Sequence, residues 1–161
     1  MYDTYASDID VVRYLTWTVH TSLHDAEVSL AAAMQSWREG SSSPWTIRRT
    51  TDGVVVGSLR GRNGRRGFEV GYVIGRAWWG NGYAAEALRA VVDWALDEPS
   101  ISVLEATTHP DNVASARVLT KCGFASEGQL SEWLVYPNLG PEPVDCAIYT
   151  IRKPAHALAS R

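Results

Sequence analysis

The sequence predicts an α/β domain in which helices flank a mixed central sheet. Helical and extended patterns alternate along the chain, and glycine-containing turns separate the extended segments. A length of 161 residues suits one domain with a full hydrophobic core. Because no internal repeat and no dividing linker is visible, we expect a single domain over residues 1–161.

The first elements are expected to be helices. A short helix near residues 8–14 precedes a longer one, which begins at Ser22 with Asp25 in a pattern that resembles a capping box. Gly40 ends this second helix. Its apolar residues recur at helical spacing and make it amphipathic: Leu23, Leu30, Met34 and Trp37.

Three extended segments follow the helices. Residues 45–50 and 54–60 are expected to form a hairpin, because Thr51-Asp52-Gly53 between them is a strong turn signal. A second turn, over residues 63–67, leads into a strand at 68–75.

The second half of the chain alternates again between helix and strand. From Gly82 an apolar stripe predicts a helix that packs on the sheet and must end before Pro99. A strand, a helix between Asn112 and Gly123, and two further strands complete the prediction, over residues 103–109, 112–121, 124–135 and 144–152.

The most informative segment is the glycine-containing turn that joins strand 68–75 to the next helix. Gly80 and Gly82 can adopt backbone angles that other residues avoid, and they lack a Cβ that would keep a ligand away. The free N–H groups at the start of a helix then form an anion site. The turn lacks the Gly-Lys-Ser/Thr of a P-loop and the third glycine of a dinucleotide fingerprint. A lone Gly-x-Gly before a helix is often only a tight turn.

A second segment strengthens the phosphate-binding interpretation. Asn112-x-x-Ser115 continues to Lys121-x-Gly-Phe124, and the first turn reads Trp79-Gly-x-Gly-Tyr-Ala-x-Glu-Ala87. Together, in order and spacing, the two segments resemble the coenzyme A motifs of the GNAT superfamily of N-acetyltransferases. The resemblance covers roughly residues 11–152 and is closest to the branch of ribosomal-protein alanine acetyltransferases.

This resemblance implies a mostly antiparallel sheet and acetyl-CoA as cosubstrate. In the family the first motif binds the pyrophosphate of coenzyme A, and the second lies beside the pantetheine arm. Arg76, Arg117 and Lys121 are candidates for the coenzyme phosphates. The expected coenzyme contacts are Tyr72, Val73, Ile74, Trp79, Gly80, Asn81, Gly82, Tyr83, Ala84, Asn112, Ser115, Arg117 and Lys121.

The family fold normally starts with a further strand, and no matching pattern precedes Tyr14. The sequence therefore predicts a sheet without the usual first strand. Either the chain as given begins late, or residues 1–6 and a partner chain cover the sheet edge, since a bare edge strand invites unwanted pairing. A homodimer is one form that such a partner would take.

Amide formation needs a base, because an amine is protonated at neutral pH and must lose a proton to react. Glu69 is the first candidate. It lies on the strand that leads into the glycine-containing turn at residues 79–87, called the coenzyme turn below, and the resembling family often carries a glutamate on this strand. Alternation sends Glu69 and Val73 to one face and Tyr72 to the other. The alternative is a solvated strand carboxylate. His109, the second candidate base, is otherwise an exposed turn histidine.

The leaving thiolate also needs stabilisation. Many members of the superfamily use a tyrosine for this, and the matching position here is Leu119. Ser115 is the substitute that the sequence offers, because its hydroxyl can donate to the sulfur. Its alternative role is to brace the helix that begins at Asn112. An N–H of the strand near Val73 is expected to bind the thioester oxygen as charge develops.

The acceptor groove is expected to have aromatic walls. Trp17, Trp133 and Tyr136 belong to segments that flank this groove in the resembling family. The loop at residues 137–143 is expected to close the groove, and Asp145 to attract a cationic amine; the alternative is an ordinary hairpin connection.

Composition excludes several functional classes. A net charge of −3 argues against a general nucleic-acid binder. No apolar run reaches membrane-spanning length, and the N-terminus lacks the pattern of an export signal, so we expect a cytoplasmic protein without a membrane partner. Cys122 and Cys146 are expected to be small buried residues rather than a disulfide. The dispersed histidines give no support for a metal site.

These observations predict an N-acetyltransferase that acts by direct attack in a ternary complex. The acceptor is a primary amine, either a protein N-terminus or a small molecule. A noncatalytic acyl-CoA-binding regulator is the alternative, for which the missing tyrosine is the one positive indication.

Overall fold

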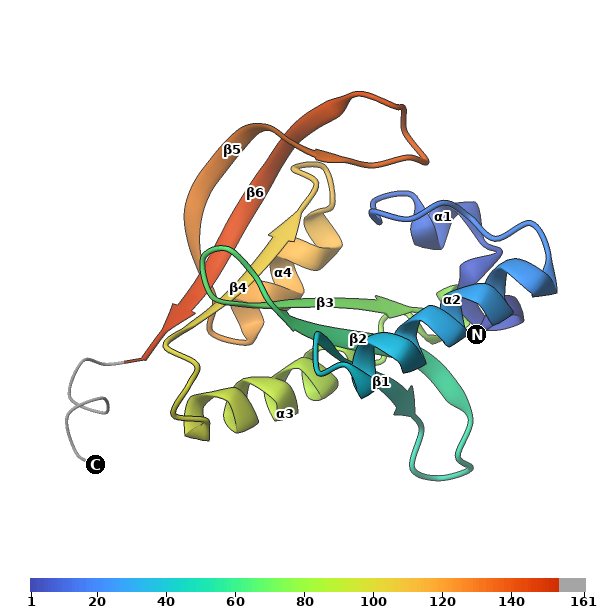
Figure 1. Ribbon diagram of the computed structural model, residues 1–161, viewed down its shortest axis with the longest axis horizontal. Helices are drawn as coiled ribbons and strands as arrows, with labels where there is room; N and C mark the ends of the chain where they lie inside the picture. Colours follow the sequence, from blue (N-terminus) through green and yellow to red (C-terminus); the bar gives the residue numbers. More distant parts are fainter. Residues whose placement is uncertain (154–161) are drawn as a thin grey trace.

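The computed structural model describes residues 1–153 and confirms the predicted mixed α/β architecture. Six strands form one sheet in the order β1-β2-β3-β4-β6-β5, and all neighbouring pairs are antiparallel except β3 and β4 (Figure 1). In chain order the elements are a π-helix at Tyr2–Ala6, α1 at Ile9–Val12, α2 at Leu23–Arg38, β1 at Ser42–Arg48, β2 at Val55–Asn63, β3 at Phe68–Ile74, a 3-10 helix at Arg76–Trp78, α3 at Tyr83–Asp97, β4 at Val103–Thr108, α4 at Val113–Lys121, β5 at Ala125–Val135 and β6 at Pro143–Arg152.

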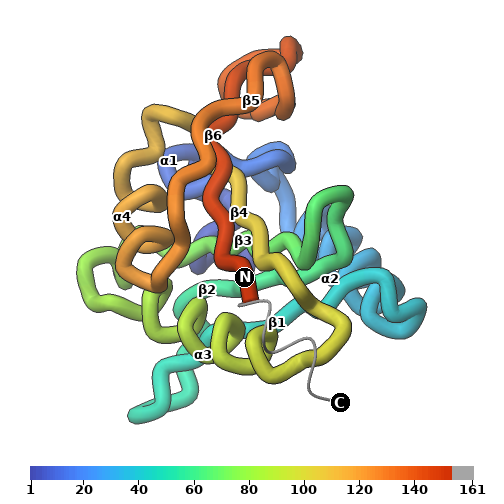
Figure 2. Tube along the Cα trace, turned by 90° about the vertical axis from the view of Figure 1, so that its left-hand side faces the viewer, coloured from blue at the N-terminus to red at the C-terminus, as the bar shows by residue number. Residues whose placement is uncertain are grey.

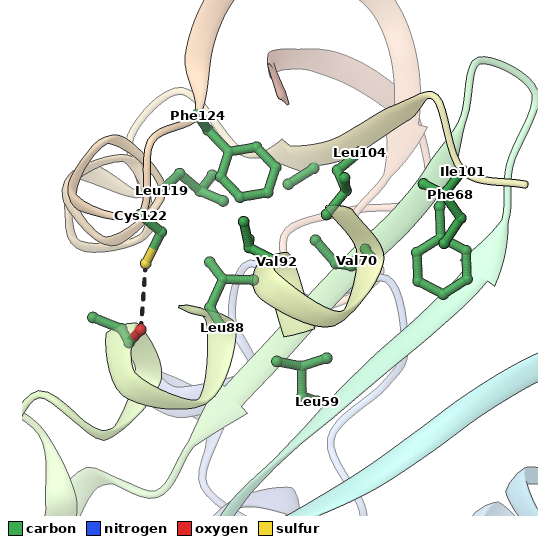
Figure 3. Packing of buried hydrophobic residues seen from close by; sticks show 13 residues of the cluster. Leu59, Phe68, Val70, Leu88, Val92, Ile101, Leu104, Leu119, Cys122 and Phe124 are labelled. Carbon is green, nitrogen blue, oxygen red and sulfur yellow. Dashed lines mark hydrogen bonds between the residues drawn. The ribbon is translucent and has the colours of Figure 1, made fainter. Parts of the chain in front are cut away.

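The side chains of β3 alternate between two hydrophobic clusters. Phe68 and Val70 enter the main core, which α3 and α4 cover on one face of the sheet (Figure 3). Val73 points to the other face and packs with Tyr5 and Ala6 of the N-terminal segment. The apolar stripe of α3 is buried as predicted, and the helix ends at Asp97, before Pro99. The core positions labelled in Figure 3 are Leu59, Phe68, Val70, Leu88, Val92, Ile101, Leu104, Leu119, Cys122 and Phe124.

The parallel strands β3 and β4 separate soon after they meet. Their register contains two pairs, Phe68 with Leu104 and Glu69 with Glu105. Beyond these pairs the sheet opens between the C-terminal ends of the two strands. This opening lies between the glycine-containing turn before α3 and the start of α4.

Helix α2 forms as the sequence predicts but buries little of its apolar stripe. Ser22 accepts a hydrogen bond from the Asp25 N–H, and the Asp25 carboxylate accepts one from the Ser22 N–H, which completes the capping box. The helix packs on the body of the protein mainly through its small residues, with Ala26 fully buried. Met34 and Trp37 each remain 56% exposed, and Leu23, Val28 and Leu30 are also exposed.

Among the described residues, no strand precedes Ser42, in agreement with the prediction of a missing first strand. Strand β1 is therefore an edge strand, and Pro44 within it lacks an N–H for further pairing. The expectation that residues 1–6 cover this edge does not hold. They instead pack beside β2 and β3, where Tyr5 donates a hydrogen bond of 3.2 Å to the Ser58 hydroxyl.

The two cysteines are free and buried, as predicted. Cys122 donates a weak hydrogen bond to the Ala85 carbonyl at 3.4 Å, which links α4 to α3 (Figure 3). At the other end of the sheet, the β5–β6 hairpin projects beyond the rest of the molecule (Figure 2). In residues 1–153, no helix has the length and apolar character needed to cross a bilayer.

Candidate active site

A cavity of about 630 Å³ lies in the opening between β3 and β4. It extends from the coenzyme turn to the start of α4, and the N-terminal segment forms its remaining wall. All the residues expected to contact the coenzyme line it except Asn81. They comprise Tyr72, Val73, Ile74, Trp79, Gly80, Gly82, Tyr83, Ala84, Asn112, Ser115, Arg117 and Lys121.

The coenzyme turn adopts the geometry of an anion site. Gly80 and Gly82 have φ angles of +76° and +85°, in the region that favours glycine, and Gly82 is the N-cap of α3. No side chain caps this helix, so its first N–H groups are free to bind a ligand. Asn81 donates hydrogen bonds to the carbonyls of Trp78 and Trp79, at 3.1 and 3.0 Å, and thereby holds the turn instead of lining the cavity.

The backbone of β3 offers hydrogen-bonding groups to the cavity. The Gly75 N–H donates to the Val56 carbonyl of β2 at 2.9 Å. Because bonding alternates along an antiparallel pair, the register of Ser58 with Val73 places the Val73 N–H toward β2 as well. The N–H groups of Tyr72 and Ile74 therefore point away from β2, and they are the candidates near Val73 for the expected thioester contact. The Ile74 carbonyl agrees with this direction, since it accepts a hydrogen bond of 2.7 Å from the Trp79 indole.

Two of the three cationic residues expected to bind the coenzyme phosphates face the cavity. Arg117 and Lys121 line the cavity from α4 and are exposed. Arg76 does not line it, because its guanidinium is bound to the carboxylates of Asp8 and Asp10. The hydrogen bonds from Arg76 also hold the pKa of Asp8 below its ordinary value. Arg76 thus fastens the start of α1 to the end of β3.

Ser115 lies at the start of α4 with both its backbone and its hydroxyl held. The Asn112 side-chain oxygen accepts a hydrogen bond from the Ser115 N–H at 3.1 Å, which confirms Asn112 as the N-cap. The Ser115 hydroxyl lies 2.9 Å from the hydroxyl of Tyr72, which reaches across the opening from β3. Burial raises the pKa of Tyr72 to about 12. At the position of the absent tyrosine, Leu119 is only 1% exposed and belongs to the hydrophobic core.

The Glu69 carboxylate lies outside the cavity. Arg62 donates hydrogen bonds to both of its oxygens, from Nε at 3.0 Å and from Nη2 at 2.9 and 2.8 Å. In the register of β3 and β4 Glu69 stands opposite Glu105, a carboxylate that sequence reasoning did not single out. Glu105 is 8% exposed, and burial raises its pKa, although Arg66 opposes this shift. Only the strand register, which the sequence does not reveal, brings these two acids together.

His109 is held by aromatic packing and by a hydrogen bond. Its ring stacks on Tyr14, with centroids 4.8 Å apart, and meets Tyr136 edge-on at 5.2 Å. Nδ1 accepts a hydrogen bond from the Asp111 N–H at 3.1 Å, so the proton of a neutral ring lies on Nε2. This tautomer leaves no free nitrogen lone pair, and His109 does not line the cavity.

The three aromatic residues expected around the acceptor do not line the cavity either. Trp17 packs against the N-terminal cluster, and Tyr136 is buried against His109. Trp133 lies on the projecting hairpin, with the Arg65 guanidinium 6.0 Å from its ring. The N-terminal wall of the cavity contains Val11, Tyr14 and Leu15 instead. Their spacing of three and four residues is typical of one helical face, and this spacing is the sequence signal that could have identified them.

Asn138 connects the predicted closing loop to this wall. Its side-chain nitrogen donates to the carbonyls of Val12 and Trp17, both at 2.8 Å. Its side-chain oxygen accepts from the Val19 N–H at 2.9 Å. The loop after β5 therefore fixes the N-terminal segment against the cavity. Within residues 1–153, no group of three or more histidine, cysteine or acidic side chains is arranged to hold a metal ion.

Comparison with known proteins agrees with this geometry. The family model described as "Acetyltransferase (GNAT) domain" matches residues 1–125. The uncharacterized N-acetyltransferase p20 of Bacillus licheniformis is 27% identical to this chain, and the match covers 95% of this chain and 86% of the p20 chain. The uncharacterized N-acetyltransferase YoaA of Bacillus subtilis is 30% identical, covering 92% and 84%. The structure of Mycobacterium smegmatis RimJ in complex with CoA-disulfide superimposes with a TM-score of 0.77 at 25% identity, covering 94% of this chain and 73% of that one.

Proposed function

Because this chain belongs to the acetyltransferase (GNAT) family, we propose that it transfers an acetyl group from acetyl-CoA to a primary amine. The observation that carries the proposal is the cavity between β3 and β4, which joins an uncapped helix N-terminus to the Ser115 hydroxyl. Acetyl-CoA supplies the activated acetyl thioester. The residues of this chain bind it, orient it and hold the acceptor beside it.

The coenzyme is proposed to bind from the α3 turn toward the opening of the sheet. The free N–H groups after Gly82 bind the pyrophosphate, and Arg117 and Lys121 add positive charge near the phosphates. The N–H of Tyr72 or Ile74, which points away from β2, donates to the thioester oxygen. Such a donor stabilises the negative charge that develops on this oxygen during attack.

The amine is proposed to enter along the wall of Val11, Tyr14 and Leu15. The ammonium form first loses one proton, the neutral nitrogen attacks the thioester carbonyl directly, the carbon–sulfur bond breaks, and the amide nitrogen releases its second proton to solvent. Ser115 donates a hydrogen bond to the departing sulfur. Glu69 receives the amine proton through water, since its carboxylate does not reach the cavity. No covalent enzyme intermediate is required.

Thiol release from acetyl-CoA tests this function. The purified protein is incubated with acetyl-CoA and a panel of amines that contains free amino acids, polyamines and peptides with free N-termini. Acetyl transfer predicts thiol release that depends on the amine, and mass spectrometry of the acceptor then separates a small molecule from a protein N-terminus. Tight binding of acetyl-CoA without thiol release for any amine would instead favour a noncatalytic acyl-CoA-binding regulator.

A further inference from the structure

The hydroxyl groups of Tyr72 and Ser115 meet across the opening between β3 and β4. The two oxygens are 2.9 Å apart, and both residues line the cavity. Tyr72 extends from the middle strand of the sheet, whereas Ser115 occupies the first turn of α4. The contact thus joins the two elements that form opposite walls of the proposed pantetheine channel.

Either oxygen of this pair can donate the hydrogen bond, and the two arrangements differ in where the Ser115 proton points. The Tyr72 hydroxyl lies within hydrogen-bond distance of two Ser115 acceptors, the hydroxyl at 2.9 Å and the carbonyl at 3.2 Å. A phenol has one proton, so it serves one of these contacts at a time, and when it goes to the carbonyl the Ser115 hydroxyl donates to the phenol oxygen. When Tyr72 donates to the hydroxyl, the Ser115 oxygen is an acceptor and its own proton is free to point into the cavity. The Asn112 cap fixes the backbone of Ser115, so the direction of the Ser115 O–H bond is what the contact with Tyr72 can still set.

We propose that Tyr72 is a positioning residue that turns the Ser115 hydroxyl toward the sulfur of coenzyme A, and this inference rests on the proposed function. Ser115 then donates its proton in a hydrogen bond to the thiolate as the carbon–sulfur bond breaks. The bonding electrons stay on the sulfur, and no proton is transferred in this step. The product leaves as a thiolate and takes a proton from solvent later.

Hydrogen bonding without proton transfer follows from the acidities. The pKa of Tyr72 is about 12, whereas that of an ordinary thiol is about 8.5. A phenol that remains protonated is a permanent donor to Ser115 over the physiological range. It cannot supply the sulfur with a proton at equilibrium. The role fits a chain in which Leu119 is buried in the core and brings no hydroxyl to the channel.

The direct test is the acidity of the coenzyme A thiol while it is bound, followed through the ultraviolet absorbance of the thiolate. A hydrogen bond to a charged group contributes enough free energy to lower the pKa of the bound thiol by about one pH unit relative to free coenzyme A. Ser115→Ala should abolish this shift, and Tyr72→Phe should remove at least half of it. The double variant should match Ser115→Ala alone. Tyr149→Phe removes a hydroxyl from another half-buried tyrosine at the core and should leave the shift intact.

Two results would overturn the proposal. One is a wild-type shift in Tyr72→Phe, and the other is a double variant whose loss equals the sum of the two single losses. Should Tyr72→Phe fail to fold, 3-fluorotyrosine placed at position 72 provides the opposite perturbation. A more acidic phenol donates more strongly to Ser115, so the pKa of the bound thiol should fall further, and an unchanged value would contradict the role.

Turnover adds a readout that a purely structural role would not reproduce. Tyr72→Phe should lower kcat about tenfold, the size expected for one weakened hydrogen bond to developing charge, and leave the KM for acetyl-CoA within about twofold. In the Ser115→Ala background it should lower kcat no further. If the wild-type protein acetylates no amine, the proposed function fails, but the thiol titration still decides the role of Tyr72.

Discussion

In the proposed site, the coenzyme half of the cavity, made by the glycine turn and the start of α4, differs from the acceptor half, the wall of Val11, Tyr14 and Leu15, in how its residues are held in place. In the coenzyme half, the glycine turn and the first turn of α4 each place several cavity residues from one short segment. The wall of the acceptor half is instead held from outside the cavity by long-range contacts, as when Asn138 binds Val12, Trp17 and Val19. The difference teaches that local backbone geometry can be predicted from a sequence, whereas an arrangement made by tertiary contacts cannot.

The strongest test of the coenzyme half is Gly82→Asp. The change places a side chain at a φ of +85° and a negative charge beside the proposed pyrophosphate. We expect coenzyme A to bind at least about 100-fold more weakly, a loss of about 2.7 kcal/mol, by calorimetry. Gly53→Asp is the matched control, because Gly53 has a similar φ of +72° in a turn that does not line the cavity. Equal affinity in the two folded variants would remove the turn from the coenzyme site.

Glu69→Gln tests whether the Glu69 carboxylate is the base that accepts the amine proton. The change preserves size and removes basicity, so the rate at neutral pH should fall about 100-fold and the acidic limb of the pH–rate curve should lose an ionisation. Raising the pH should restore part of the rate, because more of the amine is then already deprotonated. Glu105→Gln is the paired variant, since Glu105 stands opposite Glu69 in the register. If only Glu105→Gln removes the ionisation, the buried carboxylate is the base and Glu69 is not.

Asn138→Ala tests whether the acceptor wall depends on the long-range contact. The variant loses three hydrogen bonds that join the β5–β6 loop to the N-terminal segment. At about 1 kcal/mol each, their loss should lower the unfolding free energy by about 2–3 kcal/mol and raise the KM for the amine several-fold. The affinity for coenzyme A should not change. A parallel loss of coenzyme affinity would show that the two halves are not independent.

Asp8→Asn is expected to have the smallest effect. Hydrogen bonds from Arg76 lower the pKa of Asp8 in the folded state, so its ionised form stabilises the protein at neutral pH. That contribution is present above the unfolded pKa of about 3.9 and is lost as the pH falls through the lower folded value. Thermal melts should show a slightly lower Tm for Asp8→Asn at pH 7, and the difference should vanish as the pH falls below about 4. A difference that persists at low pH would point to packing instead of charge.

The same contrast explains how much of the fold was predictable. The capping box of α2, the cap at Asn112 and the end of α3 before Pro99 each depend on residues close in sequence, and each appears as expected. The pairing of Arg76 with Asp8 and Asp10 joins residues more than sixty positions apart. Nothing local in the sequence indicates that Arg76 pairs with these two carboxylates.

Strand register limited the predictions in a second way. Alternation correctly separated Glu69 and Val73 from Tyr72, because it follows from the geometry of one strand. The neighbour of Glu69 across β4 and the direction of the Val73 N–H depend on pairing between strands, which a single sequence does not specify. The exposed apolar face of α2 was equally unpredictable, since its periodicity is the same whether or not a partner covers it.

Backbone amide NMR of the protein titrated with coenzyme A tests the central claim, the proposed coenzyme site, most directly, because it compares the amides of this site with those of the rest of the chain in one experiment. We predict the largest shifts at Gly80, Gly82, Ala84 and Ser115, together with the end of β3. The amides around Trp133, on the projecting hairpin, should shift little. Saturable binding with its largest shifts outside the coenzyme turn and the start of α4, or no saturable shifts at all, would contradict this account.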